Sequence, residues 1–224
     1  GITANPLVGR FSDLLIGKGG TTILTEVPEM FGAETLLMNR CANRELFDET
    51  VSLINDFKQY FKDNHQTIYE NPSPGNKKGG ISTLEDKSLG CTQKSGSAPV
   101  CGVLSYGECV KTSGLNLLSA PGNDLVAATA LAASGAHIVL FTTGRGTPFA
   151  SPVPTVKISS NSTLAGKKKN WIDFNAGVLV EDAELDTVGQ QLFDYVIDVA
   201  SGRKVCSEEA GFHDMAIFKQ GVTL

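Results

Sequence analysis

The residues best suited to carry chemistry are three cations that stand among glycines. Arg145 is the centre of the run Thr143–Thr147, and Lys77 and Lys78 lie in the proline- and glycine-rich run Asn71–Gly80. A guanidinium offers a carboxylate two parallel hydrogen bonds, and neighbouring glycines let backbone amides approach the same anion. Lysine adds a point charge, or a general base where burial lowers its pKa. Both runs therefore predict an anion site, with a solvated turn or linker as the alternative for each.

Two further side chains are candidates for proton transfer or metal binding. Glu26 follows a short apolar segment, where a carboxylate serves as a base, as a metal ligand, or as a simple cap of the next turn. His213 stands alone near the end of the sequence, and a lone histidine is more often structural than catalytic. The run Pro121–Asp124 either points helix amides at an anion or uses Asn123 or Asp124 as an ordinary cap.

Composition argues against several classes of protein. The chain has 224 residues and a net charge of −5, and no basic face dominates, so no nucleic-acid partner is expected. No apolar run approaches the ~20 residues of a membrane-spanning helix, and no signal peptide opens the sequence. The five cysteines include no Cys-x-x-Cys pair, which disfavours a zinc site and favours a reduced, cytoplasmic protein. No Walker loop or dinucleotide-binding glycine motif follows a strand.

The elements that must position these residues alternate along the chain. The expected strands are short and apolar or β-branched: Thr21–Thr25, Cys101–Leu104, Leu115–Ser119, His137–Phe141, Thr155–Ile158 and Trp171–Phe174. Apolar spacing, caps and closing glycines predict helices from Asn5 to Gly19, over Pro28–Met38, from Asn43 to Asn64, over Ser82–Lys94 and Asp124–Ser134, and from Leu185 to Gly202.

A succession of strand, loop, helix and strand predicts parallel strands joined by crossover helices. The expected fold is one α/β domain over residues 1–224, a Rossmann-like, mostly parallel sheet of about five strands with helices on both faces. A functional loop is expected at residues 66–82. Such sheets bind ligands at the carboxyl ends of their strands. The residues there are polar or glycine-rich: Glu26, Pro121–Asp124, Thr142–Thr147 and Asn175–Gly177. The sequence thus predicts one polar rim on which Arg145 and the lysine pair share a basin.

Three long segments resemble the sugar-acid dehydratases that include altronate and galactarate dehydratases: Gly1–Pro6, Asn71–Gly80 and Phe141–Pro148. Two others, Leu24–Glu34 and Leu117–Asp124, resemble altronate dehydratase more closely than its galactarate relative. The resemblance runs almost end to end. It implies a longer enzyme whose additional N-terminal region is a partner of this C-terminal domain. It also implies a divalent metal, often iron, with part of its site in that region; the metal ligands themselves remain unknown.

The reaction implied by this resemblance is loss of water from D-altronate to give 2-dehydro-3-deoxy-D-gluconate. A base takes the proton beside the carboxylate, cations stabilise the enediolate, and an acid assists the departing hydroxyl. The residues expected to hold the substrate's carboxylate and hydroxyls are Asn76, Asn123, Thr143, Gly144, Arg145, Gly146 and Asn175. Those expected to stabilise the enediolate, move protons or bind metal are Lys77, Lys78, Glu26 and His213. No spacing separates the base from the acid.

Three alternatives stay open at this point. The first is galactarate dehydratase or another sugar-acid dehydratase. The second is a non-catalytic module that binds a sugar acid without consuming it. The third is a phosphate-ligand domain, which phosphate rather than altronate would stabilise against heat. The sequence does not identify the oligomeric state and is compatible with a homo-oligomer.

Overall fold

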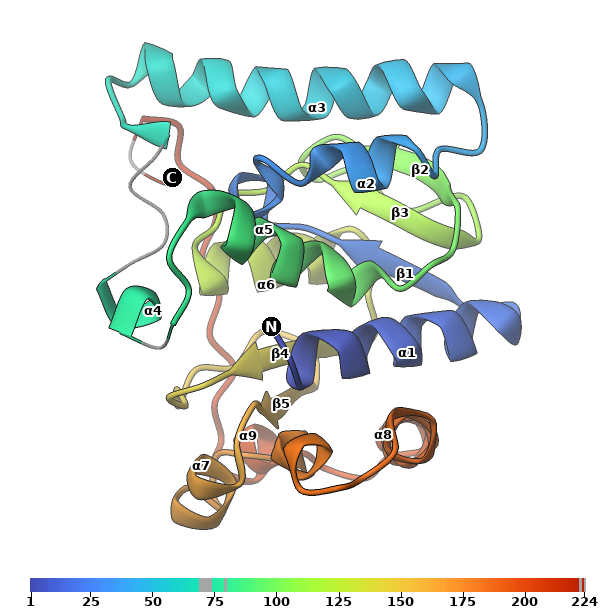
Figure 1. The fold of residues 1–224 in the computed structure, drawn as a ribbon, viewed down its shortest axis with the longest axis vertical. Coiled ribbons are helices and arrows are strands. Elements are labelled where there is room, and N and C mark those ends of the chain that lie inside the picture. Colours follow the sequence, from blue (N-terminus) through green and yellow to red (C-terminus); the bar gives the residue numbers. More distant parts are fainter. Residues whose placement is uncertain (69–73, 79, 222, 224) are drawn as a thin grey trace.

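The protein was analysed as a computed structural model that describes residues 1–68, 74–78, 80–221 and 223 (Figure 1). The side chain of Lys78 lies outside this description. The helices are α1 Ala4–Gly17, α2 Glu34–Met38, α3 Arg44–Asp63, α4 Pro74–Lys78, α5 Leu84–Thr92, α6 Asp124–Ala133, α7 Ser162–Lys167, α8 Leu185–Ala200 and α9 Cys206–Glu209. Short 3-10 helices are η1 Val27–Met30, η3 Gln93–Ser95 and η4 Gly177–Val180. The strands are β1 Thr21–Leu24, β2 Val100–Leu104, β3 Gly114–Leu118, β4 Val139–Thr143, β5 Thr155–Ser159 and β6 Phe174–Asn175.

These strands form two small sheets rather than one. The first has the order β1-β3-β2 and the second the order β4-β5-β6, and every pairing is parallel. The α/β class and the parallel pairing agree with the sequence-based prediction, whereas the single Rossmann-like sheet of about five strands is wrong. Local patterns encode strands and crossover helices, but they do not encode which edge strands meet. The edges concerned are β1 and β4, which do not pair with each other.

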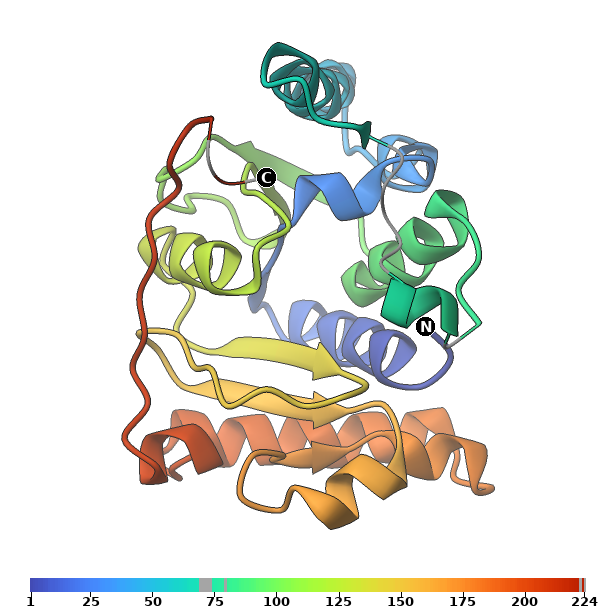
Figure 2. The ribbon, with the colours of Figure 1, turned by 90° about the vertical axis from the view of Figure 1, so that its left-hand side faces the viewer.

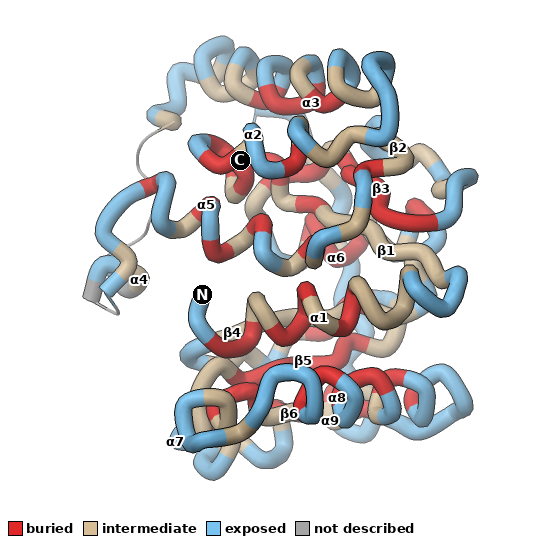
Figure 3. Tube along the Cα trace, turned by 45° about the vertical axis from the view of Figure 1, so that its right-hand side comes forward, coloured by how far each residue is buried: buried red, intermediate tan, exposed pale blue. Residues whose placement is uncertain are grey.

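Each sheet has its own apolar core. Around the second sheet, Leu7 and Phe11 of α1 pack with Ile158 of β5 and Leu192 of α8. Around the first sheet, α3 buries one face against η1 and its neighbours, and Figure 3 shows that buried face of α3 turned toward the sheet. Burying one such side chain stabilises the fold by about 1.5–3 kcal/mol. The two cores therefore stabilise two halves, and other contacts must join them.

Side-chain caps fix the starts of several helices. Asn43 accepts a hydrogen bond from the amide of Leu46 at the start of α3, and Thr83 accepts one from Asp86 at the start of α5. Such caps satisfy amides that have no partner inside the helix, and each is worth about 1 kcal/mol. The predicted cap at Asn43 and the helix that follows it are confirmed.

Four local predictions need correction. The single helix expected over Pro28–Met38 is divided into η1 and α2. The strand expected to begin at His137 begins at Val139, and His137 itself is exposed. The strand expected over Trp171–Phe174 is only β6, two residues long. The run Asn71–Gly80, expected to be irregular, contains α4 in its described part. Proline is tolerated in the first turn of a helix, where its missing amide would have no partner. Pro74, the first residue of α4, has that position, while residues 71–73 and 79 lie outside the described residues.

The two halves are joined by both ends of the described chain. Near the start, the Asn5 side chain donates to the carbonyl of Gly90 on α5 and accepts from the hydroxyl of Thr142 on β4. Near the end, residues 211–221 run as an extended segment across the flank of the molecule, past α6 toward α3 (Figure 2). The amide of Asp214 bonds the carbonyl of Ala150, and the amide of Gly221 bonds the Tyr60 hydroxyl on α3.

Candidate active site

The turn after β1 holds a non-glycine residue in the left-handed region. Glu26 has φ 66° and ψ 63°. For a residue with a side chain this conformation costs about 1–3 kcal/mol, and such strain clusters at functional sites. Neighbouring backbone groups impose it: the Glu26 carbonyl accepts from Glu29, and the next amide, that of Val27, bonds the carbonyl of Ala120 after β3. The carboxylate is thereby fixed at the carboxyl end of the first sheet.

Two ion pairs and a thiol surround this carboxylate. Lys94 Nζ lies 3.5 Å from Glu26 Oε2, and Lys87 Nζ lies 2.9 Å from Glu29 Oε1. The thiol of Cys91 donates to Glu29 Oε2 at 3.4 Å. The four charged side chains are only 14–21% exposed, so water screens them weakly. These five residues are called the acid–lysine cluster below.

The α5–η3 segment supplies three members of the cluster at helical spacing. Lys87, Cys91 and Lys94 are four and then three residues apart, which places them on one face. α1 packs closely on η3, and the absence of a side chain at Gly9 permits this approach. A Cβ at Gly9 would collide with the carbonyl oxygen of Gln93. The cluster is therefore enclosed by α1 on one side and by the turn after β1 on the other.

Burial and the excess of carboxylates determine the protonation states. Burial raises the pKa of Glu26, and the charges of Glu29 and Asp124 act in the same direction against the opposing effect of Lys94. Burial alone would lower the pKa of Lys94, but the neighbouring Glu26, Cys91 and Glu29 outweigh it and raise that pKa. Lys94 is consequently a permanent cation rather than a base. Burial, with Glu29 and Glu26, raises the pKa of Cys91 to about 11, so its thiol is protonated at neutral pH.

Asn5 links this cluster to the carboxyl end of the second sheet. Its amide nitrogen donates to the carbonyl of Gly90 on α5 at 2.9 Å. Its oxygen accepts from the hydroxyl of Thr142, at the end of β4, at 2.9 Å. The loop that carries Arg145 begins two residues after Thr142. One side chain therefore fixes the distance between the acid–lysine cluster and the arginine loop.

The arginine loop is ordered by hydrogen bonds on both sides of Arg145. The Thr143 hydroxyl accepts from the amide of Gly146 at 2.9 Å, and Asn161 donates to the carbonyl of Gly144 at 3.1 Å. Gly146 has φ 81°, a value that glycine adopts without strain. Arg145 is exposed, and no residue of the described chain forms an ion pair or hydrogen bond with its guanidinium. The guanidinium is thus available to an anion.

A buried lysine holds the rest of this loop. Lys157 is 1% exposed, and its Nζ donates to the carbonyls of Thr147 at 3.0 Å and Phe149 at 2.9 Å. Burial lowers the pKa of Lys157, partly opposed by the nearby carboxylate of Asp173. A buried ammonium requires such acceptors because leaving it unpaired is costly.

The remaining predicted site residues lie in varied surroundings. Asn123 accepts a hydrogen bond from the amide of Val126 and so caps α6. Capping was the simpler of the two interpretations of the run Pro121–Asp124. Asn175 donates to Ser162 and accepts from Gly177, which uses its side chain locally. In α4, Asn76 is half-buried and Lys77 is exposed. Figures 1 and 2 place α4 on the same side of the molecule as the loop that follows β4.

His213 belongs to a different region. It is exposed on the segment 211–221, which Figure 2 shows on the opposite flank from α5 and the N-terminus. The structure therefore does not bring His213 to Glu26. Its next neighbour, Asp214, bonds the carbonyl of Ala150, which gives this stretch a structural contact.

The acid–lysine cluster is a poor match for a divalent metal. Its carboxylates are paired with Lys94 and Lys87, which already supply the positive charge that a cation would bring. In the part of the chain that the structure describes, no three histidine, cysteine, aspartate or glutamate side chains are grouped as metal ligands. These residues alone do not fit an iron site.

Sequence reasoning missed most of the cluster. It identified Glu26 but placed Lys87 and Cys91 in a helix over Ser82–Lys94 without a functional role. The usable signal was the spacing of Lys87, Cys91 and Lys94 on one helical face. Charged residues at this spacing usually form a solvated face, and the packing of α1 against η3 and of η1 against α5 removes this one from water.

The sequence of the chain is similar to those of known proteins, and this similarity identifies its family. The family description "D-galactarate/Altronate dehydratase, C-terminal" matches residues 1–223. The chain is 65% identical over its whole length to an altronate dehydratase of Bacillus subtilis (strain 168) and 61% identical to one of Escherichia coli (strain K12). It spans 45% of the length of each. A galactarate dehydratase (L-threo-forming) of Escherichia coli is 38% identical over 97% of the chain and 42% of its own length. The chain therefore belongs to the D-galactarate/altronate dehydratase family and corresponds to its C-terminal domain.

Proposed function

We propose that this chain is the C-terminal part of an altronate dehydratase, a cytoplasmic hydro-lyase that converts D-altronate to 2-dehydro-3-deoxy-D-gluconate. The observation that carries the proposal is the identity of 61–65% along the full chain to two altronate dehydratases. The lower identity to a galactarate dehydratase, 38%, favours altronate as the substrate. The domain is proposed to act together with the N-terminal region of the longer protein, which would also supply ligands for Fe²⁺.

The acid–lysine cluster suits the proton-transfer steps. Glu26 is proposed as the base that takes the proton beside the substrate carboxylate. Its buried position raises its pKa, which makes it a stronger base than a solvated glutamate. Lys94, a permanent cation at 3.5 Å, is suited to stabilise the enediolate that this step creates. A separate acid then donates a proton to the departing hydroxyl, which leaves as water.

The arginine loop suits the binding step. Arg145 is proposed to hold the substrate carboxylate together with the amides of Gly144 and Gly146. Lys77 and Lys78 of α4 are proposed to approach the same anion, and Asn76 and Thr143 to contact hydroxyl groups. Asn123 and Asn175 are also proposed to contact hydroxyl groups of the substrate, which would have to replace the local hydrogen bonds of these two side chains.

The test is an assay of the full-length protein with Fe²⁺ on altronate and galactarate side by side. The proposal expects turnover of altronate with kcat/KM at least tenfold above that for galactarate. If galactarate were turned over in preference to altronate, the proposed substrate would be wrong, while the proposed reaction class, a dehydration, would stand. Binding of altronate without consumption, measured by calorimetry, would instead indicate a non-catalytic sugar-acid-binding module.

Arg145→Ala is the matching variant for the binding step. Loss of a bidentate contact to a carboxylate is expected to raise KM by at least tenfold, because such a contact contributes about 1.5–3 kcal/mol. Lys169→Ala, which removes another exposed cation, serves as the control. Wild-type KM and turnover in Arg145→Ala would exclude Arg145 from carboxylate binding.

A further inference from the structure

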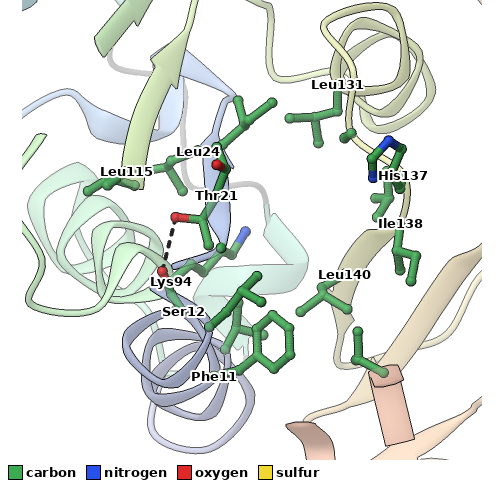
Figure 4. Close-up of a pocket in the computed structure, with 18 of the residues that line it drawn as sticks. Phe11, Ser12, Thr21, Leu24, Lys94, Leu115, Leu131, His137, Ile138 and Leu140 are labelled. Atoms are coloured by element: carbon green, nitrogen blue, oxygen red, sulfur yellow. Dashed lines mark hydrogen bonds between the residues drawn. The ribbon is translucent and has the colours of Figure 1, made fainter. Parts of the chain in front are cut away.

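A cavity of about 540 Å³ separates the two sheets (Figure 4). It extends along the whole of β1, from Gly20 to Glu26, and along residues His137–Leu140 at the start of β4. Figure 4 shows Thr21 and Leu24 of β1 facing that segment across open space. α1 closes one side, and the end of α6 closes another. We call this space the inter-sheet cavity.

The lining of the inter-sheet cavity is mostly apolar. Side chains from α1, α6, β4 and α8 form its walls: Phe11, Leu15, Leu131, Leu140 and Val196. Charged groups, Glu26 and Lys94, occur at its end toward the acid–lysine cluster. These apolar side chains offer no partners to the hydroxyl groups of a sugar acid, which could bond only to the polar side chains and strand edges between them. The apolar walls therefore suit apolar side chains better than they suit the substrate proposed above.

The two facing strands have open edges along this cavity. β1 pairs with β3 and β4 pairs with β5, and no strand in the described ranges pairs with either on the other side. Each strand of a parallel sheet directs backbone groups to both of its neighbours. The open sides of β1 and β4 thus present amides and carbonyls that require hydrogen-bond partners. A hydrocarbon ligand would fill the volume but would leave those groups unsatisfied.

The strands are also aligned for a shared partner. Figure 1 shows the arrowheads of β1 and β4 pointing toward the same side of the molecule, with α1 packed across both strands. Asn5 ties the carboxyl end of β4 to α5, which flanks the carboxyl end of β1. A strand inserted between them would pair with both edges at once. Strands that are covered on both faces, as this one would be by α1 and α6, are apolar throughout.

We propose that the inter-sheet cavity binds an extended, apolar polypeptide segment that pairs with β1 and β4 and joins the two sheets into one. The occupant assigned here is a strand of about five residues from the rest of the longer dehydratase polypeptide. More than half the length of each altronate dehydratase relative lies outside the region matched by this chain, which supplies ample sequence for it. This inference rests on the proposed membership in a longer polypeptide and not on the reaction.

Photo-cross-linking in the full-length protein tests the occupant. A benzophenone amino acid replaces His137, which is exposed and lies at the mouth of the cavity, so the fold is spared. The expected product is an intramolecular cross-link to a segment outside residues 1–224, identified by mass spectrometry. The same amino acid at Val180, exposed and outside the cavity lining, is the control and should not capture that segment. Cross-links confined to residues 1–224, cross-links to a second copy, or none would overturn the proposal.

Hydrogen exchange in the same protein gives an independent measurement. The amides of β1 should exchange as slowly as those of β3, which is paired on both sides. If the cavity stays empty, the open-side amides of β1 should exchange at least tenfold faster than those of β3, and that result would overturn the proposal. Neither measurement depends on turnover. A failed cross-link with normal dehydration would therefore reject the strand and leave the proposed activity intact.

Discussion

At the scale of single residues, Glu26 combines an unusual backbone conformation with an unusual charge environment. Its left-handed backbone offers a sharp experiment, because glycine adopts the same φ without strain. Glu26→Gly should therefore keep the turn after β1 and remove only the carboxylate. In the full-length enzyme we expect kcat for altronate to fall by about 10²–10⁴, the usual contribution of a general base.

Asp182 provides the matched control for this variant. It is exposed and has φ 71°, so Asp182→Gly makes the same backbone change away from the acid–lysine cluster. We expect full activity and a change in the free energy of unfolding of less than about 1 kcal/mol. If Glu26→Gly retained wild-type turnover, Glu26 would be only a strained turn residue.

Lys94 should control the pH dependence of the same step. A base must be ionised, so kcat/KM falls as the pH drops below the pKa of Glu26 in the free enzyme. Lys94 opposes the upward shift of that pKa. Lys94→Met should consequently raise the pKa of Glu26 and move the acid limb of the kcat/KM profile to higher pH. Lys169→Met, an exposed lysine, should leave the limb in place.

The outcome that contradicts this prediction is an unchanged acid limb in Lys94→Met.

The raised pKa of Glu26 also makes the stability of the fold depend on pH. Because burial raises the folded-state pKa of Glu26, its contribution to stability is greatest at low pH and is lost as the pH rises through that value. Glu26→Gln should remove this loss, as measured by unfolding at several pH values.

At the scale of elements, Asn161 shows how one cap positions the arginine loop. Its oxygen accepts from the amide of Leu164 at the start of α7, and its nitrogen donates to Gly144. Asn161→Asp keeps the cap, since aspartate caps as well as asparagine, but it removes the donor to the loop. We expect KM for altronate to rise several-fold while the free energy of unfolding changes by less than about 1 kcal/mol.

The same substitution at another cap separates the two roles. Asn43 at the start of α3 accepts from Leu46, and Asn43→Asp should alter neither KM nor stability beyond about 0.5 kcal/mol. Steady-state kinetics and urea unfolding of both variants check the prediction. An unchanged KM in Asn161→Asp would show that the bond to Gly144 does not position Arg145.

The elements also show how much of the fold can be predicted from the sequence. Apolar spacing and caps such as Asn43 are local, so the long helices are predicted almost to the residue. The loop around Arg145 is identified for the same reason. The division into two sheets is not predictable, because local patterns do not show whether the edges of β1 and β4 meet. Lys94 is missed because its burial is produced by α1, which is distant in sequence.

At the scale of the whole molecule, the segment 211–221 fastens one half to the other. Its anchor is Phe218, whose ring centroid lies 5.5 Å from that of Tyr60 on α3 and 5.4 Å from that of Tyr106 after β2. Its amide also bonds the Tyr106 hydroxyl at 2.9 Å. The segment reaches these rings from Ala150, just before β5, where the amide of Asp214 is bound.

Phe218→Ala should therefore loosen the link between the halves without removing a buried residue of either core. Loss of two aromatic contacts is expected to lower the free energy of unfolding by about 1–3 kcal/mol. Hydrogen exchange should accelerate more in α3 than in α8, because α8 belongs to the other core. Met215→Ala, which removes a side chain that is 67% exposed on the same segment, should change neither. Equal acceleration in both helices would mean that the halves already unfold as one unit and that the segment adds no separate restraint.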